Sequence, residues 1–285
     1  MIANILDGLV LGLQFGLLAA GLTLIYGLGG VLNLGYGQIA VTSAMTVALA
    51  MDAGIPVLLA IGLGLLAGGL FGLLLDLTIL RPVYRLHGEA RVLLSLLLTL
   101  GVSFIIDGYL NWRYPLKALN LYIGGGAIEV LGVPMRRGSL VASAITLFTL
   151  MGLFVFFRST SLGRAIRSVI EDEAGARLIG IDPKKMLRLI LVLSGVLAAL
   201  VAVTRSMIAP VDTTSGLSIT VFALIVTVVG GLGNFVGALL AGIILGIVSV
   251  VAADLIGSYI SLIILLGAAA VTILIRPAGL LGVKE

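Results

Sequence analysis

IPVLLAIGLGLLAGGLFGLLLDLTIL, residues 55–80, is an unbroken apolar run with a single charged side chain, Asp76. About 20 such residues in a helix cross a hydrocarbon core of roughly 30 Å. Similar runs recur along the whole chain, in which 60% of the 285 residues are hydrophobic, 11% are charged and the mean hydropathy is +1.28. A soluble domain has about a quarter of its residues charged. The sequence therefore predicts a polytopic membrane protein.

Apolar length and the Gly, Pro and charge breaks divide the chain into spans. The predicted fold class is all-α, a helical transmembrane bundle of about eight or nine spans within one domain, residues 1–285. The predicted spans are residues 8–27, 34–51, 55–80, 92–111, 139–157, 187–208, 218–232, 235–253 and 257–275. Segment 218–232 is short and ends in glycines, so it and its successor are alternatively a re-entrant pair, which leaves eight spans.

The basic residues predict the orientation. Loops 81–91 and 158–188 and the tail 276–285 share one side and hold twelve of the seventeen Lys and Arg residues. The positive-inside rule makes this side cytoplasmic and places the N-terminus on the other side. The first residues carry no basic segment, so we expect a retained span and not a cleaved signal peptide. The outer loop 112–138 has an alternating pattern over 127–134 that predicts a small hairpin.

Composition also excludes several kinds of site. The chain has no cysteine and a single histidine, His87, so no disulfide, thiolate site or metal site is expected. The net charge of +4 resides in short loops between spans, which argues against nucleic acid as a partner. No paired acids within a span support an embedded enzyme, so no catalytic residue is predicted.

Glycine clusters predict close helix packing. Small residues at four-residue spacing let backbones approach where no hydrophobic force drives association in lipid. The glycines concerned are Gly62, Gly64, Gly68, Gly69 and Gly72 in one span and Gly237, Gly242 and Gly246 in another. We interpret most of them as packing positions and not as contacts to a solute. Asp76 and Arg81, near the inner end of their span, are expected only to anchor it.

Residues 164–186, RAIRSVIEDEAGARLIGIDPKKM, are too polar to cross a membrane and too regular for an idle linker. Helical spacing places Ile170, Ala174, Leu178 and Ile181 on one apolar stripe and predicts the i,i+4 pairs Arg167 with Glu171 and Glu173 with Arg177. Gly180 is a predicted helix stop, and Asp182-Pro183 predicts the start of the next helix. The segment either lies on the membrane surface or fits a cleft on a soluble partner.

Five motifs in order resemble one family. They are GLTLIYG (21–27) with GVLNLGYGQ (30–38), Arg81-Pro82, LGRAIR (162–167) leading to Glu173-Ala174 and LIGI (178–181), VGGLGN (229–234) with Gly237-Ala238, and RPAGLLG (276–282). Together they resemble the H-type permease subunits of bacterial branched-chain amino acid ABC importers along nearly the whole chain. Tyr36 stands where that family commonly has histidine, and Asp107 where a neutral amide is more usual. Both departures bear on the substrate.

The resemblance implies a permease subunit in the bacterial inner membrane that works by alternating access. Its implied partners are two cytoplasmic ABC ATPases, a second related permease and a periplasmic substrate-binding protein, with lipid around the spans. A coupling helix over 168–181 would contact an ATPase. The residues assigned to this contact are Arg167, Glu171, Glu173, Ala174, Arg177, Leu178, Gly180 and Ile181. The chain has no G-x-x-x-x-G-K-[ST] loop, so ATP would be hydrolysed in a partner and no cofactor is expected here.

Polar side chains at membrane depth are the candidates for a substrate pathway, because they usually face the bundle interior or a watery cavity. The candidates are Gln14, Asn33, Gln38, Ser95, Thr99 and Asp107. Asn33 lies in the glycine-rich break 27–37, which is either a half-helix end that orients a zwitterion or an ordinary turn. The alternative function is a stand-alone, ion-coupled secondary transporter or channel for a small polar solute. It would be expected to show intramembrane acids in repeat-related spans, whereas Asp107 is nearly alone.

Overall fold

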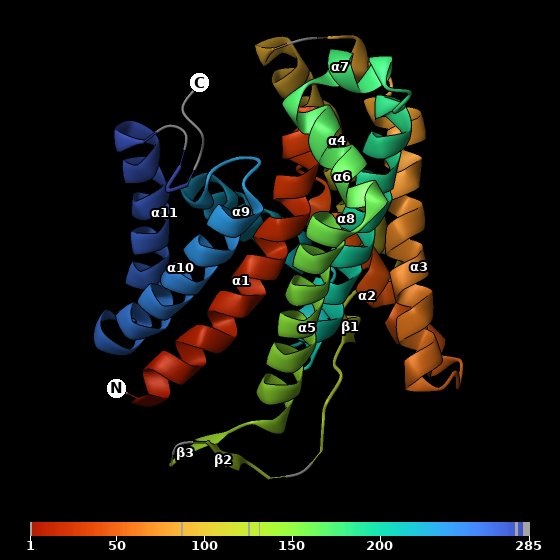
Figure 1. Ribbon diagram of the computed structural model, residues 1–285. Coiled ribbons are helices and arrows are strands. Elements are labelled where there is room, and N and C mark those ends of the chain that lie inside the picture. The colour runs from red at the N-terminus through yellow and green to blue at the C-terminus, as the bar shows by residue number, and fades with distance from the viewer. Residues whose placement is uncertain (1, 87, 125, 131, 277–278, 282–285) are drawn as a thin grey trace.

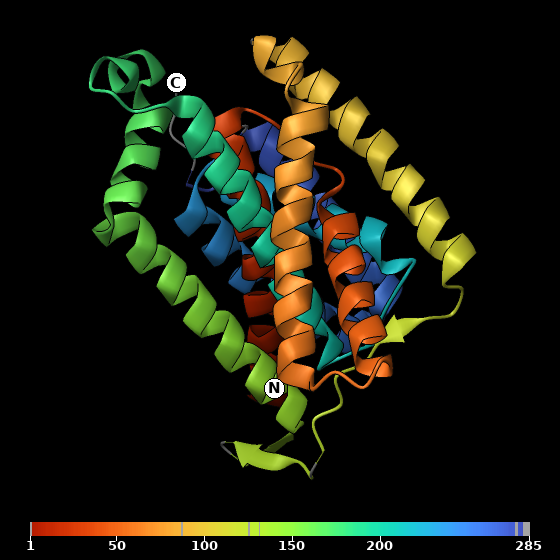
Figure 2. The ribbon, with the colours of Figure 1, turned by 90° about the vertical axis from the view of Figure 1, so that its right-hand side faces the viewer.

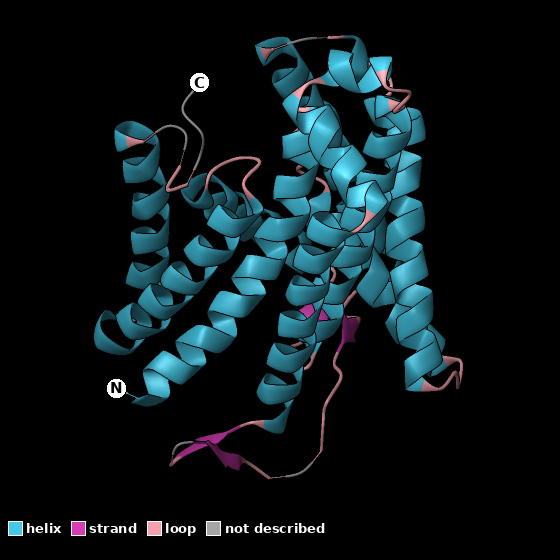
Figure 3. Ribbon diagram, in the orientation of Figure 1, coloured by secondary structure: helices cyan, strands magenta, loops and turns pink. Residues whose placement is uncertain are grey.

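The computed structural model describes residues 2–86, 88–124, 126–130, 132–276 and 279–281. His87, Leu131 in the predicted hairpin, and residues 277, 278 and 282 of the C-terminal motif lie outside these ranges. Figure 3 shows that helices dominate the described chain and that the short strands lie toward one end.

Each predicted span coincides with a helix. In the described residues these are α1 (Ile2–Gly29), α2 (Tyr36–Asp52), α3 (Val57–Leu75), α4 (Glu89–Arg113), α5 (Arg137–Ser159), α8 (Pro183–Ser206), α9 (Ser215–Gly230), α10 (Phe235–Ile256) and α11 (Ser258–Ile275). Seven of them are long and apolar enough to cross a membrane, α3 being counted with the π-helical turn η1 (Asp76–Leu80) that continues it. The exceptions are α2 and α9, which are shorter. The full length of α10 leaves α9 as the one short member of the predicted pair.

The bundle has two distinct ends (Figure 1). The α7 end carries the short helices α6 (Ser161–Glu171) and α7 (Glu173–Leu178) and the 3₁₀ turn η2 (Val83–Arg85). The hairpin end carries the start of α1 and the antiparallel strands β2 (Ile128–Val130) and β3 (Val133–Met135), which confirm the predicted hairpin. A second antiparallel pair, β1 (Ala118–Leu119) with β4 (Val211–Asp212), fastens the loop after α4 to the loop before α9.

The core is built around α1. In its most apolar 18-residue window 78% of residues are buried, against 17% for α4 and 11% for α11. α1 runs between α10 and α11 on one side and α2, α3 and α8 on the other (Figure 1). Figure 2 shows α3 in front, with α4 and α5 on the two flanks. The peripheral helices expose large apolar side chains, as helices in contact with lipid or another membrane chain must.

Glycines form the closest helix contacts, as their spacing predicts. A Cβ added to Gly12 on α1 would lie 2.7 Å from the Cα of Ile243 on α10, and one added to Gly242 would lie 2.8 Å from the Cα of Gly16. Similar backbone contacts are made by Gly8, Gly246, Gly68, Gly72, Gly195 and Gly237. Gly62 is different because no atom lies within 4 Å of its added Cβ. We call the α1–α10 contact the glycine seam.

Candidate functional site

The chain between α1 and α2 turns back into the bundle. The amide of Leu32 donates to Ser95 Oγ (3.2 Å) and that of Leu34 to Thr99 Oγ1 (3.0 Å), both on α4. Ser95 and Thr99 are ~9 Å and ~15 Å along the axis from the start of α4 at the α7 end. Residues 30–35, which we call the polar break, therefore lie inside the bundle, and α2 begins there and not at the surface. Of the two alternatives for this break, its position inside the bundle favours a half-helix end over an ordinary turn.

The first turn of α2 is held by α4 and α9. Gly37 N donates to Thr220 Oγ1 (2.9 Å), and Gln38 Nε2 donates to Asp107 Oδ1 (3.2 Å). Gly216 of α9 packs directly on the Gln38 amide, since an added Cβ would lie 2.7 Å from Gln38 Oε1. Gln38 and Asp107 thus join two helices at membrane depth.

Some polar atoms at the break have no protein partner among the described residues. Asn33 Oδ1 accepts from Gly35 N (2.9 Å), whereas Asn33 Nδ2 and Gln38 Oε1 are buried and make no hydrogen bond there. Most buried polar groups in folded proteins are paired, so unpaired ones require an explanation. The unpaired donor and acceptor beside the start of α2 are therefore candidate hydrogen-bonding positions for a small polar solute. The described residues contain no cluster of three metal-ligating side chains.

Gln14 does not belong to this group. Its Nε2 donates to Thr146 Oγ1 of α5 (3.0 Å), and its Oε1 accepts from Thr204 Oγ1 of α8 (3.0 Å). Both ends of the amide are satisfied, so Gln14 joins α1, α5 and α8. The structure therefore places the segment that carries Asn33 and Gln38 along Ser95, Thr99 and Asp107 of α4, and it places Gln14 in a separate contact.

The start of α9, which presents Gly216 to Gln38, is fixed by Asp212. Asp212 Oδ1 accepts from Thr214 N (3.0 Å), Thr214 Oγ1 (2.9 Å) and Ser215 Oγ (2.7 Å). Burial raises the pKa of this carboxyl, but the hydrogen bonds from Ser215 and Thr214 outweigh it and hold the pKa below its usual range. Hydrogen bonds to the charged form stabilise that form. Asp212 therefore fixes, in its anionic form, the turn that leads into α9.

The predicted single helix over 168–181 is wrong, because the segment forms two helices. α6 ends at Glu171, and Asp172 has an extended backbone while its Oδ1 accepts from Ala174 N (2.9 Å) to cap α7. Asp and Ser side chains compete with helix by such local bonds. The predicted Arg167–Glu171 pair is not formed among the described residues, whereas Glu173 and Arg177 pair at 2.6 Å. Gly180, with φ +85°, ends this segment as predicted.

The buried face of α6 also differs from the predicted stripe. Gly163, Ile166 and Val169 are buried against the bundle, and Thr160 caps the helix by accepting from Gly163 N (3.0 Å). Ile170 and Leu178 remain exposed, Leu178 to 89%. Ala174 is exposed as well, and Ile181 is partly buried. Helices α6 and α7 are thus fixed to the bundle by one face, and they leave apolar side chains exposed at the α7 end.

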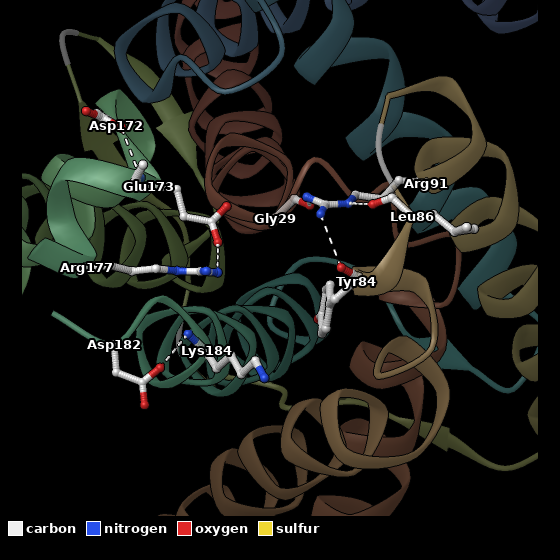
Figure 4. A network of polar contacts seen from close by, with 10 residues as sticks. Gly29, Tyr84, Leu86, Arg91, Asp172, Glu173, Arg177, Asp182 and Lys184 are labelled. Carbon is white, nitrogen blue, oxygen red and sulfur yellow. Dashed lines mark hydrogen bonds and ion pairs between the residues drawn. The ribbon is translucent and has the colours of Figure 1, made fainter.

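The start of the helix that follows α7 agrees with its sequence signal. Asp182 Oδ1 accepts from Lys184 N (3.0 Å), and Pro183 occupies the first turn of α8. This contact and the Glu173–Arg177 pair are seen side by side in Figure 4. The Glu173–Arg177 pair lies within α7, and the Asp182 contact caps the first turn of α8.

Sequence reasoning did not find Arg91. Its guanidinium donates to the carbonyls of Leu86 (2.7 Å), Gly29 (3.2 Å) and Tyr84 (3.4 Å), which ties the start of α4 to the end of α1 (Figure 4). Thr220 and Asp172 were also missed. A threonine in an apolar helix and an aspartate in an acidic run carry no local sign of such roles, because the partners are distant in sequence or depend on backbone geometry.

Comparison with known families decides the class of the protein. The model of the branched-chain amino acid transport system / permease component family matches residues 4–275. The chain belongs to this family. As a family member with seven membrane-length helices in its described part, it is a multi-pass membrane protein and a permease component of ABC transport systems.

Similar proteins agree with this family. The permease protein BraD of the high-affinity branched-chain amino acid transport system of Pseudomonas aeruginosa is 26% identical over 99% of this chain and 96% of its own length. LivH of Escherichia coli is 26% identical over 80% of this chain and 78% of its own. The fructose import permease FruF of Bifidobacterium longum is 28% identical over 76% of this chain and 60% of its own.

The fold is also found in a solved structure. PsaBC from Streptococcus pneumoniae, determined in complex with a Fab, superposes with a TM-score of 0.51 at 15% identity and covers 98% of this chain and 97% of that one. At this identity the likeness concerns the arrangement of helices and not the solute.

Proposed function

We propose that this chain provides one half of the membrane pathway of an ATP-driven importer for branched-chain or related amino acids, and that the solute passes along the polar break. The unpaired Asn33 Nδ2 and Gln38 Oε1 beside the start of α2 carry this proposal. Such buried donors and acceptors suit a solute with amino and carboxylate groups, because each group finds a complementary atom. The names of BraD and LivH support the amino-acid class. FruF shows that related permeases also carry sugars.

The energy would come from partners at the α7 end. The sequence has no phosphate-binding G-x-x-x-x-G-K-[ST] loop, so two cytoplasmic ABC ATPases are proposed to bind and hydrolyse ATP, with no cofactor in this chain. The exposed Ile170 and Leu178, on a helix pair fixed by its other face, suit a specific and reversible contact with such a partner. ATPase closure would push α6–α7 and switch the pathway between outward-open and inward-open states.

A second, related permease and a periplasmic substrate-binding protein complete the proposed importer. The α7 end would be cytoplasmic and the hairpin end periplasmic in a bacterial inner membrane, with the N-terminus periplasmic and the C-terminus cytoplasmic. The native chain contains no cysteine, so this orientation can be tested by single introduced cysteines. Leu178→Cys should react with a membrane-impermeant maleimide only after inner-membrane vesicles are turned inside out, and Leu116→Cys only in intact cells. The reverse pattern would contradict the orientation.

The transport class is tested by reconstitution into proteoliposomes. We expect amino-acid uptake only when the chain, the second permease, active ATPases and the binding protein are all present with ATP. ATPases lacking their catalytic glutamate are the matched control. Uptake by this chain alone under a proton or sodium gradient would identify a secondary transporter instead.

The ATPase contact is tested by paired substitutions. Leu178→Glu should weaken co-purification of the ATPases at least about tenfold, because it places a charge in an apolar contact. Leu116→Glu is the control, since Leu116 is fully exposed at the hairpin end. Charge reversal Glu173→Lys should act in the same direction as Leu178→Glu. Equal co-purification for all three variants would remove α6–α7 from the interface.

A further inference from the structure

A cavity of about 440 Å³ lies at the α7 end, outside the polar break. Its walls come from the end of α1, from η1 and η2, from α7 and from the first turns of α8. Figure 4 shows Glu173 and Arg177 on one side of this space and Tyr84 and Arg91 on the other. The cavity is therefore formed where several spans end.

The lining is strongly basic, and half of its cations are already engaged. Arg91 is held by three backbone carbonyls, Arg177 pairs with Glu173, and Arg188 pairs with the buried Asp76 at 3.1 Å. Asp76 is thus more than the anchor expected from sequence.

Three further cations remain. Arg81, Arg85 and Lys184 also line the cavity, and none has an acidic partner among the described residues. Three uncompensated cations around one cavity attract an anion with several acceptor oxygens, and arginine in particular matches a phosphate.

One wall continues into the lipid-facing surface. Leu77 of η1 lines the cavity and is also exposed. Leu66, Leu70 and Leu74 follow it along α3 at helical spacing, and all are exposed large apolar side chains. An apolar stripe that starts at a basic cavity fits a ligand with a charged head and a hydrocarbon tail. A free anion or an acidic peptide has no hydrocarbon chain that would contact this apolar stripe.

We propose that this cavity binds the phosphate headgroup of an anionic phospholipid through Arg81, Arg85 and Lys184, with an acyl chain lying along Leu77 and Leu74. Basic pockets at the ends of membrane helices bind such headgroups. The π-helical turn η1 supports a functional role, because π turns are rare and frequently mark functional sites. The bound lipid joins the end of α3 to the start of α8, directly beside α7.

The test measures lipid binding to the purified full chain by native mass spectrometry with dioleoyl phosphatidylglycerol and dioleoyl phosphatidylcholine. The triple variant Arg81→Gln, Arg85→Gln, Lys184→Gln should bind phosphatidylglycerol on the order of 100-fold more weakly, since each basic residue near a membrane surface contributes about fivefold. The control triple Arg136→Gln, Arg137→Gln, Lys185→Gln removes the same charge. It uses the neighbour of Lys184 and two residues near the hairpin end, and it should bind like the wild type.

Further arms separate the sources of phosphate. The variant Leu77→Asn should lose phosphatidylglycerol but not inorganic phosphate, and millimolar phosphate should not displace the lipid from the wild type. Displacement by phosphate, with Leu77→Asn unaffected, would make this a free-phosphate site and overturn the lipid assignment. Equal binding of the two lipids by the wild type, or equal losses in the two triples, would overturn it as well. The measurement needs no ATPase and no transport, so its result is independent of the proposed function. Unfolding curves confirm that the variants are folded.

Discussion

Gln14 and Gln38 are both buried glutamines in the bundle, exposed to 6% and 1%, yet their surroundings differ. The Gln14 amide is satisfied at both ends by threonines from two other helices. The Gln38 amide donates to Asp107 and leaves its own oxygen without a partner in the described chain. Burial of a polar side chain therefore does not by itself indicate a pathway. What separates a structural contact from a binding position is how many of the side chain's donors and acceptors have no hydrogen-bond partner in the protein.

The largest effect is expected at Gln38. Gln38→Leu removes the free acceptor and the bond to Asp107, so uptake in the reconstituted importer should fall about tenfold or more. The unfolding free energy should change little, because half of this amide was unpaired. Initial uptake rates and unfolding in detergent measure the two quantities. A large loss of stability with unchanged uptake per folded protein would assign Gln38 to packing.

The same substitution at Gln14 should give the opposite result. Gln14→Leu removes two hydrogen bonds between helices, each worth about 0.6 kcal/mol on average in a membrane protein, so the unfolding free energy should fall by about 1 kcal/mol. Uptake per folded molecule should be unchanged. The matched control is the Gln38→Leu variant, prepared and measured under the same conditions. Loss of uptake at full stability would bring Gln14 back into the pathway.

A smaller effect is expected when Gln38 is displaced and not removed. The methyl group of Gly216→Ala would press on the Gln38 amide and shift it from Asp107, so uptake should fall about threefold. Gly108→Ala is the control, because no atom lies within 4 Å of a Cβ at Gly108 on α4. Similar uptake by the two variants would show that the position of the Gln38 amide does not matter.

The smallest effect is expected at Asp212, in the turn before α9. The folded state lowers the pKa of Asp212, so its stabilising contribution is complete above the unfolded pKa of about 4 and is lost as pH falls through the folded value. Asp212→Asn should therefore destabilise at neutral pH, by no more than about 0.5 kcal/mol because the site is partly exposed. Unfolding curves at pH values from 7 down to 3 measure this difference, which should shrink as the pH falls below about 4. A constant difference would exclude the charge as its source.

Most of the fold could be predicted from the sequence. Span length decides a membrane helix almost alone, so all nine predicted spans coincide with helices in the described chain. The glycine spacing predicted the close contacts, and Gly180 and Asp182-Pro183 marked true helix ends because their signals are local. The break at Asp172 was missed. An aspartate within an amphipathic pattern is compatible with both a continuous helix and a cap, and its backbone geometry decides between them.

The candidate site could be predicted in part. Asn33, Gln38 and Asp107 stand out as polar residues at membrane depth. Gln38 and Asp107 are hydrogen-bonded to each other, and Asn33 bonds to Gly35 N in the turn just before Gln38. Neither the partners of Gln14 nor the Asp76–Arg188 pair could be found, because these contacts join residues more than a hundred positions apart. Whether a buried amide is fully hydrogen-bonded depends on those distant partners, and a single sequence does not show which residues they are.

The glycine seam has a mechanical consequence. Where Gly12 and Gly16 of α1 meet Gly242 and Ile243 of α10, backbone touches backbone, and no side chain there can change its rotamer to make room. If one helix slid past the other, Cβ atoms of neighbouring residues would clash with the backbone of the partner helix. We therefore expect α1 and α10 to move together as one rigid unit. Opening of the bundle then requires the more lightly packed outer helices to move around this rigid pair.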